Sequence, residues 1–275
     1  MNRQYIVFSK HLSWIGGKQL ADAVAEAGFD GVDLAVRPGG HVLPQNVAED
    51  LPRTVERLAA RSLSCPSLVT AITGPTAEAE AIVRAASSCG VSAYRMGYLD
   101  YGNSITESLL EHRTAFEGLA ELNARHRIHG AYQNHVGKRV GSAVWDLLPL
   151  LDGLPPESMG CQYDVRHAVL ESGTSWELAL RRLSPWIRTI VVKDGYWKRG
   201  DDGTFTPTSC PIGTGMVDWT RFTELLPGTA WDGIVSVHFE FPLFPEDPAT
   251  LTEAERTRKT IDAMRAELER VKAVV

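Results

Sequence analysis

Short apolar runs alternate with longer helix-patterned segments along this chain of 275 residues. Apolar runs bounded by turn residues are typical of buried strands, and we predict eight, at 5–8, 31–34, 64–69, 93–96, 130–134, 160–163, 187–192 and 234–239. The segments between and after them predict helices at 18–27, 48–60, 76–89, 106–126, 142–151, 175–183, 218–226 and 251–274. Strands that alternate with helices indicate βαβ crossovers and therefore a parallel sheet.

The fold that this alternation predicts is a (β/α)8 TIM barrel. Such barrels take about 250 residues as one domain, which agrees with the length of this chain. The competing fold, a doubly wound sheet, usually carries a glycine-rich turn after its first strand, whereas Ser9–Leu12 follows the first strand here. No segment resembles a linker, so we expect a single barrel domain over residues 1–275 and no nucleotide cofactor.

The composition excludes several classes of protein. Hydrophobic residues make up 44% and charged residues 23%, which is ordinary for a globular chain and argues against disorder. The net charge of −6 gives no basic surface for nucleic acid or for an anionic membrane. The four cysteines form no CxxC pair, and neither a signal peptide nor a run of 18 apolar residues is present. We therefore expect a cytoplasmic protein with reduced thiols.

Polar residues are concentrated where the predicted strands end. In a TIM barrel the catalytic groups lie at the C-terminal ends of the strands and in the loops that follow. The polar residues at these ends are Lys10, His11, Asp33, Arg37, His41, Arg95, Gln133, Asn134, His135, Asp164, Arg166, His167, Lys193, Asp194, His238 and Glu240. Five of the eight histidines are among them. This concentration predicts an active site at one rim of the barrel.

Side chains two residues apart on a strand share a face, so pairs of these residues are expected to line the barrel mouth together. Gln133 is paired in this way with His135, and His238 with Glu240. An alternative is that Lys193 and Glu240 form a buried ion pair that only supports the barrel, because structural ion pairs also gather in such interiors.

The sequence resembles the sugar phosphate isomerase/epimerase family, the xylose isomerase-like barrels. The similar segments are GFDGVDLAVRPGGHVLP in the second strand and its loop, AYQNHVG in the fifth, QYDVRHA in the sixth, VVKDG in the seventh, PIGTGMVDW before the seventh helix, and DGIVSVHFEF in the eighth strand. Each motif is short, but their order and spacing together are fairly specific. The resemblance implies a TIM barrel that acts on a sugar-like small molecule.

In that family a divalent metal is held at the barrel mouth by Glu, Asp, His and Glu from strands five to eight. The resemblance therefore implies Mn, Mg, Zn or Co, with Asp164 matching its ligand position. Gln133, Val191 and His238 stand where the other three ligands are expected, and Glu240 follows two residues later. A dication prefers anionic oxygen and imidazole ligands. The candidate metal set is thus Asp164, His238 and Gln133, and the alternatives of a weakened metal site and of no metal remain open.

The departures also change the candidate catalytic residues. Gln133 cannot take a proton, whereas an imidazole titrates near neutrality, so we expect His238 to transfer protons, with Glu240 orienting it or sharing that role. Lys193, which would repel a metal, or His135 would stabilise a developing enolate oxygen. The candidate substrate-binding residues are His167, Arg37, His41, Arg95, Gln133 and Trp197, the last as a stacking platform after strand seven.

We therefore expect an isomerase or epimerase that moves a proton next to a carbonyl of a sugar, keto-sugar or sugar-derived substrate, through an enediolate-type intermediate. One alternative is a lyase or hydratase that acts on a keto-glycoside through the same intermediate. Another is a non-catalytic sugar-binding barrel that has lost its metal site. An endonuclease for abasic DNA, which shares the wider superfamily, is disfavoured by the net charge of −6. Assembly into a homo-oligomer remains open.

Overall fold

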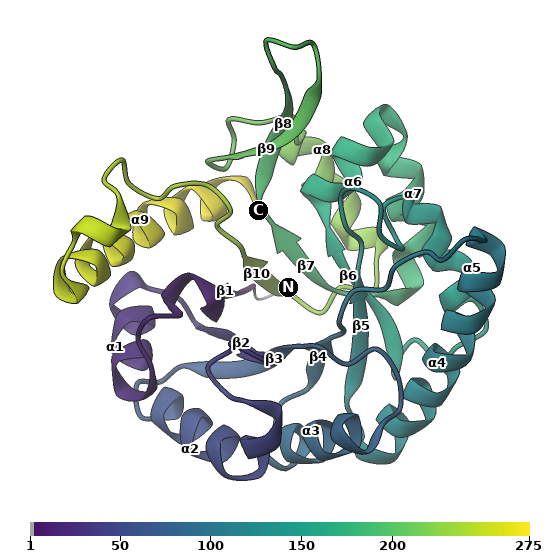
Figure 1. Cartoon of the computed structure of the whole chain (residues 1–275), viewed down its shortest axis with the longest axis horizontal. Coiled ribbons are helices and arrows are strands. Elements are labelled where there is room, and N and C mark those ends of the chain that lie inside the picture. Colours follow the sequence, from purple (N-terminus) through teal and green to yellow (C-terminus); the bar gives the residue numbers. More distant parts are fainter. Residues whose placement is uncertain (1–2) are drawn as a thin grey trace.

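The chain folds as a closed barrel of eight parallel strands surrounded by helices, so the predicted TIM barrel is confirmed (Figure 1). The computed structural model describes residues 3–275. The order around the barrel is β1-β10-β7-β6-β5-β4-β3-β2. The strands are β1 (Gln4–Phe8), β2 (Gly31–Val36), β3 (Ser64–Thr70), β4 (Ala93–Arg95), β5 (His129–Gln133), β6 (Met159–Asp164), β7 (Ile187–Val192) and β10 (Ile234–Val237).

The helices cover the outside of the barrel and bury their apolar sides against the strands. They are α1 (Gly17–Ala27), α2 (Val47–Ala59), α3 (Ala77–Ser88), α4 (Ile105–His126), α5 (Leu148–Leu151), α6 (Val165–Ser172), α7 (Trp176–Leu183), α8 (Trp219–Leu225) and α9 (Glu253–Val274). The start of α9 is fixed by a capping box, in which Thr252 and Glu255 each bond the other's backbone N–H. The main apolar core lies between this helical layer and the strands.

Two helices differ from the prediction. The helix predicted at 142–151 is a 3-10 turn, Val144–Leu147, followed by the short α5. Pro149 has no backbone N–H to continue the hydrogen-bonding pattern, so the two pieces do not merge. The opposite difference is α6, an unpredicted eight-residue helix that begins directly after β6, with Asp164 as its N-cap.

The second unpredicted feature is a hairpin that projects from the barrel after β7 (Figure 1). Its antiparallel strands, β8 (Asp194–Arg199) and β9 (Phe205–Cys210), form a separate two-stranded sheet. The Asp194 carboxylate accepts from the backbone N–H groups of Gly213 and Gly215 and from Trp219 Nε1, at 3.0–3.1 Å. A Cβ on Gly215 would clash with that carboxylate, so the close approach requires glycine.

The interior of the barrel is polar toward the mouth. Phe8, Ala35 and Val69 form a small apolar cluster that is separate from the main core. Buried polar side chains surround it, and Gln162 Nε2 on β6 reaches Asp33 Oδ2 on β2, 3.5 Å away, although these strands are not neighbours in the sheet. A contact between non-neighbouring strands of a closed barrel crosses its interior.

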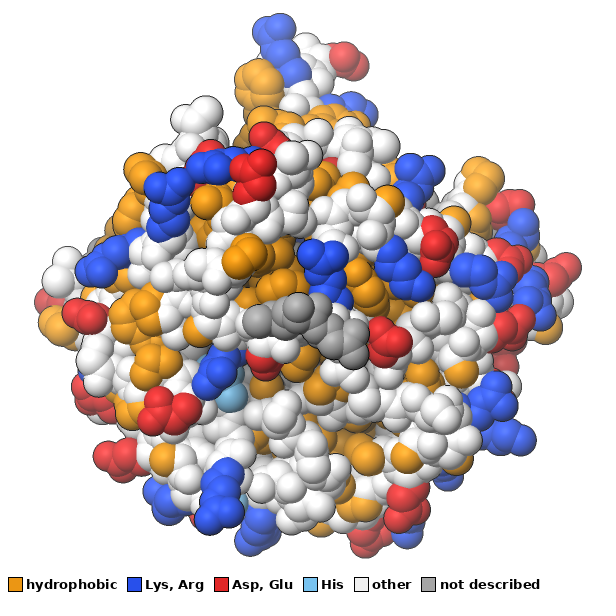
Figure 2. All heavy atoms as spheres, turned by 180° about the vertical axis from the view of Figure 1, so that it is seen from behind, with side chains coloured by type: hydrophobic (Ala, Val, Ile, Leu, Met, Phe, Trp, Pro, Cys, Tyr) orange, Lys and Arg blue, Asp and Glu red, His pale blue; other side chains and the backbone are white. Residues whose placement is uncertain are grey.

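Charges of both signs are mixed on the face that Figure 2 shows from behind, as is typical of a solvated surface. Within residues 3–275 no helix is long and apolar enough to cross a membrane.

Candidate active site at the barrel mouth

The parallel register brings the predicted polar residues to one end of the barrel. Gln133 lies beside Gln162, and Asp164 lies beside Val191. Val191 in turn lies beside Ser236. The C-terminal ends of β5, β6, β7 and β10 therefore form one continuous wall, which the loop residues Lys193 and Glu240 extend.

A three-residue ion cluster occupies the centre of this wall. Lys193 Nζ lies 3.0 Å from Asp164 Oδ2 and 3.2 Å from Glu240 Oε1. Burial would raise the pKa of Asp164 and of Glu240, but nearby positive charge, including Lys193, holds both below their usual values. Burial would lower the pKa of Lys193, and the two carboxylates raise it instead. All three groups are therefore charged at neutral pH, and the pairing of Lys193 with Glu240 considered from the sequence is present.

The side chain of Gln133 is fixed at both of its polar atoms. Nε2 donates to Asp164 Oδ2 over 2.7 Å. Oε1 accepts from Arg95 Nη1 at 2.8 Å and from the Tyr98 hydroxyl at 2.9 Å. Tyr98 was not among the candidates from the sequence; the signal that could have indicated it is its position in the loop three residues after Arg95.

Two histidines adjoin Asp164. Asp164 caps α6 by accepting from the backbone N–H of His167 at 3.0 Å, and His167 Nδ1 donates to the carbonyl oxygen of Asn134 at 2.9 Å. Burial lowers the pKa of His167 to about 3, so its ring is neutral. The half-exposed ring of His135 lies 4.6 Å from that of His167 and 4.4 Å from that of Tyr98, centroid to centroid.

His238 is held by a relay to Asp33, another residue absent from the candidate roles assigned from the sequence. The Ser236 hydroxyl donates to Asp33 Oδ2 over 2.7 Å. Because a carboxylate can only accept, Ser236 Oγ then accepts from Nε2–H of His238, at 3.1 Å. Nδ1 is consequently the unprotonated nitrogen of the neutral ring. Burial lowers the pKa of His238 below its ordinary 6.5, against the opposing effect of Asp33.

The ring of Phe8 packs against several of these groups. The His238 ring packs on Phe8 with centroids 4.8 Å apart. The guanidinium groups of Arg37 and Arg95 lie 5.4 and 5.7 Å from the centroid of the same ring. Arg37 is half-exposed, so it borders the mouth, whereas Arg95 is buried within it.

Two of the substrate-binding candidates, His41 and Trp197, hydrogen-bond backbone carbonyl groups. His41 Nε2 lies 3.2 Å from the Leu12 carbonyl and 3.1 Å from that of Ile15, which ties it to the loop after β1. Trp197 lies on β8, and its indole N–H donates to the Leu170 carbonyl at the end of α6 over 2.9 Å. The polar atoms of these residues therefore bond the backbone of the loop after β1 and of α6, and the ion cluster does not include them.

A cavity of about 260 Å³ adjoins the mouth between the loops that follow β1 and β10. Its lining includes Phe239, Phe241, Trp14, Lys10, His11 and Arg256, and contains no acidic residue. The Arg256 guanidinium carbon lies 3.6 Å from the centre of the Trp14 ring. His11 lines this cavity and adjoins the site: its Nε2 accepts from the Phe239 backbone N–H at 2.9 Å, and its ring lies 6.5 Å from that of His238.

A divalent metal does not fit the residues at the mouth. Within the described chain no group of three or more His, Cys, Asp or Glu side chains is arranged to hold an ion. Of the candidate set, Asp164 is paired with Lys193, the Gln133 carbonyl is occupied by Arg95 and Tyr98, and His238 is bonded toward Asp33. Dications require free oxygen or imidazole donors, and a dication would also face the Lys193 ammonium.

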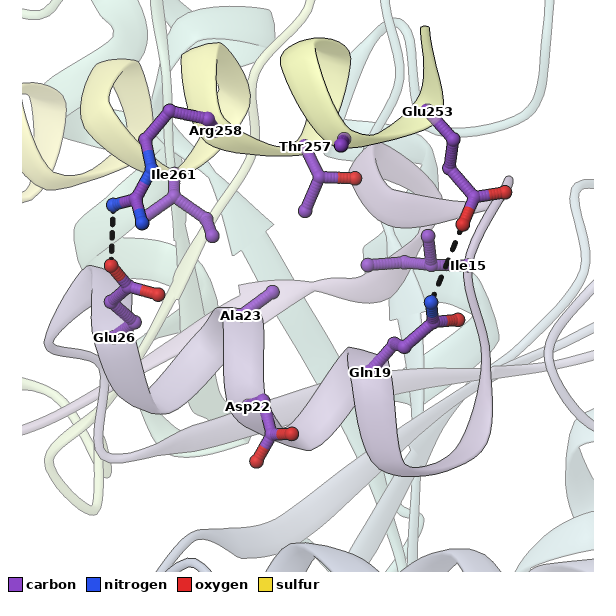
Figure 3. A pocket seen from close by; sticks show the side chains of 10 residues that line it. Ile15, Gln19, Asp22, Ala23, Glu26, Glu253, Thr257, Arg258 and Ile261 are labelled. Atoms are coloured by element: carbon purple, nitrogen blue, oxygen red, sulfur yellow. Dashed lines mark hydrogen bonds and ion pairs between the residues drawn. The ribbon is translucent and has the colours of Figure 1, made fainter.

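A second hollow, of about 280 Å³, lies between α1 and α9 (Figure 3), and Trp14 of the cavity beside the mouth donates to Thr257 in its lining. Gln19 and Glu253 bond across it at 3.3 Å, and Glu26 pairs with Arg258. None of the residues of the ion cluster lines it. We refer to it below as the α1–α9 seam.

Comparisons with known proteins agree with this architecture. The family model described as xylose isomerase-like TIM barrel matches residues 21–267. No curated protein matches the chain. Among solved structures, a putative xylose isomerase from Rhodospirillum rubrum is similar at 15% identity and a TM-score of 0.71, covering 100% of both chains. The 3-keto-D-glucoside 4-epimerase YcjR of E. coli is similar at 12% identity and a TM-score of 0.68, covering 96% of this chain and 100% of that one. The probable 3-DHS dehydratase AsbF of Bacillus anthracis is similar at 15% and 0.67, covering 98% of each. Identities this low establish the shared fold only.

Proposed function

The chain belongs to the xylose isomerase-like TIM barrel family, and on that premise we propose that it is a sugar-modifying enzyme that moves a proton at a carbon next to a carbonyl. The observation that carries this proposal is the relay from Asp33 through Ser236 to His238, which leaves an unprotonated Nδ1 on a histidine at the barrel mouth. A base of this kind at a strand end is suited to abstract a proton.

The proposed step conserves atoms and charge. The C–H bond next to the carbonyl breaks, and its proton passes to His238 Nδ1. The electron pair moves toward the carbonyl, whose oxygen becomes an enolate. His238 becomes positively charged, and Asp33 stabilises that charge through Ser236, since the carboxylate is already ionised and buried. Lys193 supplies the positive charge that the enolate oxygen requires.

Returning the proton from His238 to the neighbouring carbon, with transfer of the hydroxyl proton between the two oxygens, gives an isomer. Delivery of a proton to the opposite face of the same carbon by a second group gives an epimer. Loss of a leaving group from the next carbon gives an elimination instead. We favour epimerisation or isomerisation of a keto-sugar. This preference is supported by two similar structures, the 3-keto-D-glucoside 4-epimerase YcjR and a D-allulose 3-epimerase from Methylomonas sp. in complex with D-allulose.

We infer that the part of the substrate away from the reacting carbon lies in the cavity beside the mouth. Its aromatic residues suit a sugar ring or an apolar group. Its lining contains the cations Lys10 and Arg256 and no acid, which favours a substrate with a carboxylate or phosphate.

The test is hydrogen exchange in D2O with a panel of ketoses and 3-keto-glucosides, followed by NMR at the carbons next to the carbonyl. We expect the protein to incorporate deuterium there, and His238→Ala to slow incorporation by about 10²–10⁴-fold without unfolding the chain. His126→Gln, which changes a surface histidine at the end of α4, is the matched control and should leave the rate unchanged. Sugars that bind without any exchange would identify a non-catalytic barrel and end the proposal.

A further inference from the structure

We propose that the Lys193 ammonium takes the place of a divalent metal at this barrel mouth, so that the site works with a fixed organic cation. The catalytic part of this inference rests on the proposed function, whereas its metal-binding part rests on the arrangement of the side chains alone.

The position of Lys193 is that of a shared counter-ion. Its Nζ bridges Asp164 on β6 and Glu240 beyond β10, at 3.0 and 3.2 Å. An ion held between carboxylates from two strands has the connectivity that a metal would have. The side chain is only 4% exposed and the Asp164 side chain is fully buried, so neither partner is easily displaced by water.

The charges around Lys193 already balance. Three carboxylates, Asp164, Glu240 and Asp33, face three cations, Lys193, Arg95 and the half-exposed Arg37. Arg95 joins the cluster through Gln133. A dication added to this group would leave two uncompensated positive charges in a buried site, which is strongly unfavourable.

The neutral amide of Gln133 suits a neighbouring lysine but not a divalent metal. Its amide NH2 donates to Asp164, which already accepts from Lys193, and its carbonyl is held by Arg95 and Tyr98. A glutamate here would place another carboxylate beside Asp164 and Glu240, and that arrangement needs more positive charge than Lys193 and Arg95 provide together. The glutamine is therefore the residue expected beside a single-charge cation.

Val191 completes the argument because it is adjacent to Asp164 in the register yet offers no lone pair. It is fully buried on the same wall and stands where the family resemblance places a histidine. The mouth thus departs from the family's ligands at positions 133 and 191, and Lys193, which the family resemblance also places here, fills the space between Asp164 and Glu240. Changing residues 133, 191 and 193 should create the site that the wild type lacks.

The experiment is Mn²⁺ binding measured by electron paramagnetic resonance, in which the signal of free hydrated Mn²⁺ disappears on binding. We expect Gln133→Glu/Val191→His/Lys193→Met to bind one Mn²⁺ per chain, and further Asp164→Asn to abolish that binding. The wild type should leave the free signal unchanged. Wild-type binding of one Mn²⁺ that is lost on Asp164→Asn would overturn the inference, as would a folded triple variant that binds none.

Two single variants keep the test decisive if the triple variant does not fold. Lys193→Arg keeps the charge and should still exclude Mn²⁺, and Lys193→Met removes it and should admit Mn²⁺ weakly at Asp164 and Glu240. Equal Mn²⁺ binding by the two would contradict the inference.

The activity measurement separates the two proposals. EDTA should leave wild-type deuterium exchange unchanged, and Lys193→Met should slow it by about 10²–10³-fold, as loss of one oxyanion-stabilising group does. If no sugar shows exchange but the Mn²⁺ results hold, the proposed function fails and the replacement of the metal stands. If exchange is lost with EDTA and restored by Mn²⁺, the replacement fails and the proposed function stands.

Discussion

The barrel mouth and the α1–α9 seam each contain pairs of oppositely charged side chains, but the pairs differ in their exposure to solvent. At the seam, the Glu26 and Arg258 side chains are 42% and 59% exposed (Figure 3). At the mouth, Asp164 and Lys193 are 0% and 4% exposed. Exposed pairs contribute about 0–1 kcal/mol, whereas breaking a buried pair costs about 3–5 kcal/mol. Burial of the charges, more than the presence of a hollow, distinguishes a site that can perform chemistry.

This difference also explains why the mouth charges need so many partners. Taking charges out of water is unfavourable unless each is paired and hydrogen-bonded. Asp164 accepts from Gln133, from the backbone of His167 and from Lys193. The seam charges stay in contact with water and require no such network.

The largest expected difference between the two regions is in stability. Asp164→Ala should lower the free energy of unfolding by about 3–5 kcal/mol, because Lys193, Gln133 and the α6 N-terminus lose a shared partner. Urea denaturation followed by circular dichroism measures this. Asp164→Asn, which keeps the shape and the cap but removes the charge, should cost less than Asp164→Ala. Equal costs would mean that the lost charge, which both variants share, and not packing or the cap dominates at the mouth.

The pH dependence of activity should report the protonation states of His238 and Lys193 at the mouth. His238 must be neutral to accept a proton, and burial lowers its pKa below 6.5, so activity should rise with pH at values below 6.5 and be constant near neutrality. Lys193 must be charged, and its pKa is raised above 10.5, so activity should fall only as pH rises beyond that value. Deuterium-exchange rates across pH measure both limbs. An acidic midpoint above 6.5 would contradict the assignment of His238.

Stability at acid pH should also depend on the mouth. The folded-state pKa values of Asp164 and Glu240 lie below their ordinary values of 3.8 and 4.5. Their stabilisation is therefore complete above those ordinary values and is lost as pH falls through the lower folded-state values. The thermal stability of the wild type should therefore fall in this acidic range. The stability of Lys193→Met should depend less steeply on pH there. Parallel pH curves for the two proteins would indicate that the ion cluster does not govern acid stability.

A smaller effect is expected in the cavity beside the mouth. Lys10→Gln and Arg256→Gln should each raise KM for an anionic substrate, by about tenfold for one lost charged hydrogen bond, and leave kcat nearly unchanged. Steady-state kinetics with matched anionic and neutral sugars test this. Similar KM changes for both sugars would show that the two cations do not recognise charge.

The smallest effect is expected at the seam. Glu26→Ala should change the free energy of unfolding by less than about 1 kcal/mol, and high salt should remove even that contribution. Urea denaturation at low and high salt is the measurement. A loss as large as that of Asp164→Ala would erase the distinction between the two regions.

The sequence allowed the barrel and most of its rim to be predicted, because strand and helix patterns are local and strand ends converge by the geometry of the fold. Asp164 and Lys193 were located in this way. The elements that were missed have weak local signals: α6 is only eight residues long, and the hairpin strands β8 and β9 are mostly exposed and polar.

Hydrogen-bond partners within the site were harder to predict, because they depend on strand register and on which side chains meet across the barrel interior. The relay from His238 to Asp33 joins residues about two hundred positions apart, through Ser236. The orientation of the Gln133 amide depends on Tyr98, which lies in an irregular loop. Neither contact follows from spacing along one strand.

The β8–β9 hairpin has a consequence for how this barrel can diversify. Its strands bond to each other and form no part of the barrel sheet, and Asp194 fastens the base through the loop containing Gly213 and Gly215. Beyond the clamp, Trp197 bonds the Leu170 carbonyl of α6, and the tip of the hairpin projects away from the barrel (Figure 1). Insertions, deletions and exchanges in the hairpin can accumulate there while Lys193, one residue before the clamp, keeps its position. The hairpin can therefore vary in sequence and length during evolution, and so alter specificity, while the residues of the ion cluster keep their positions.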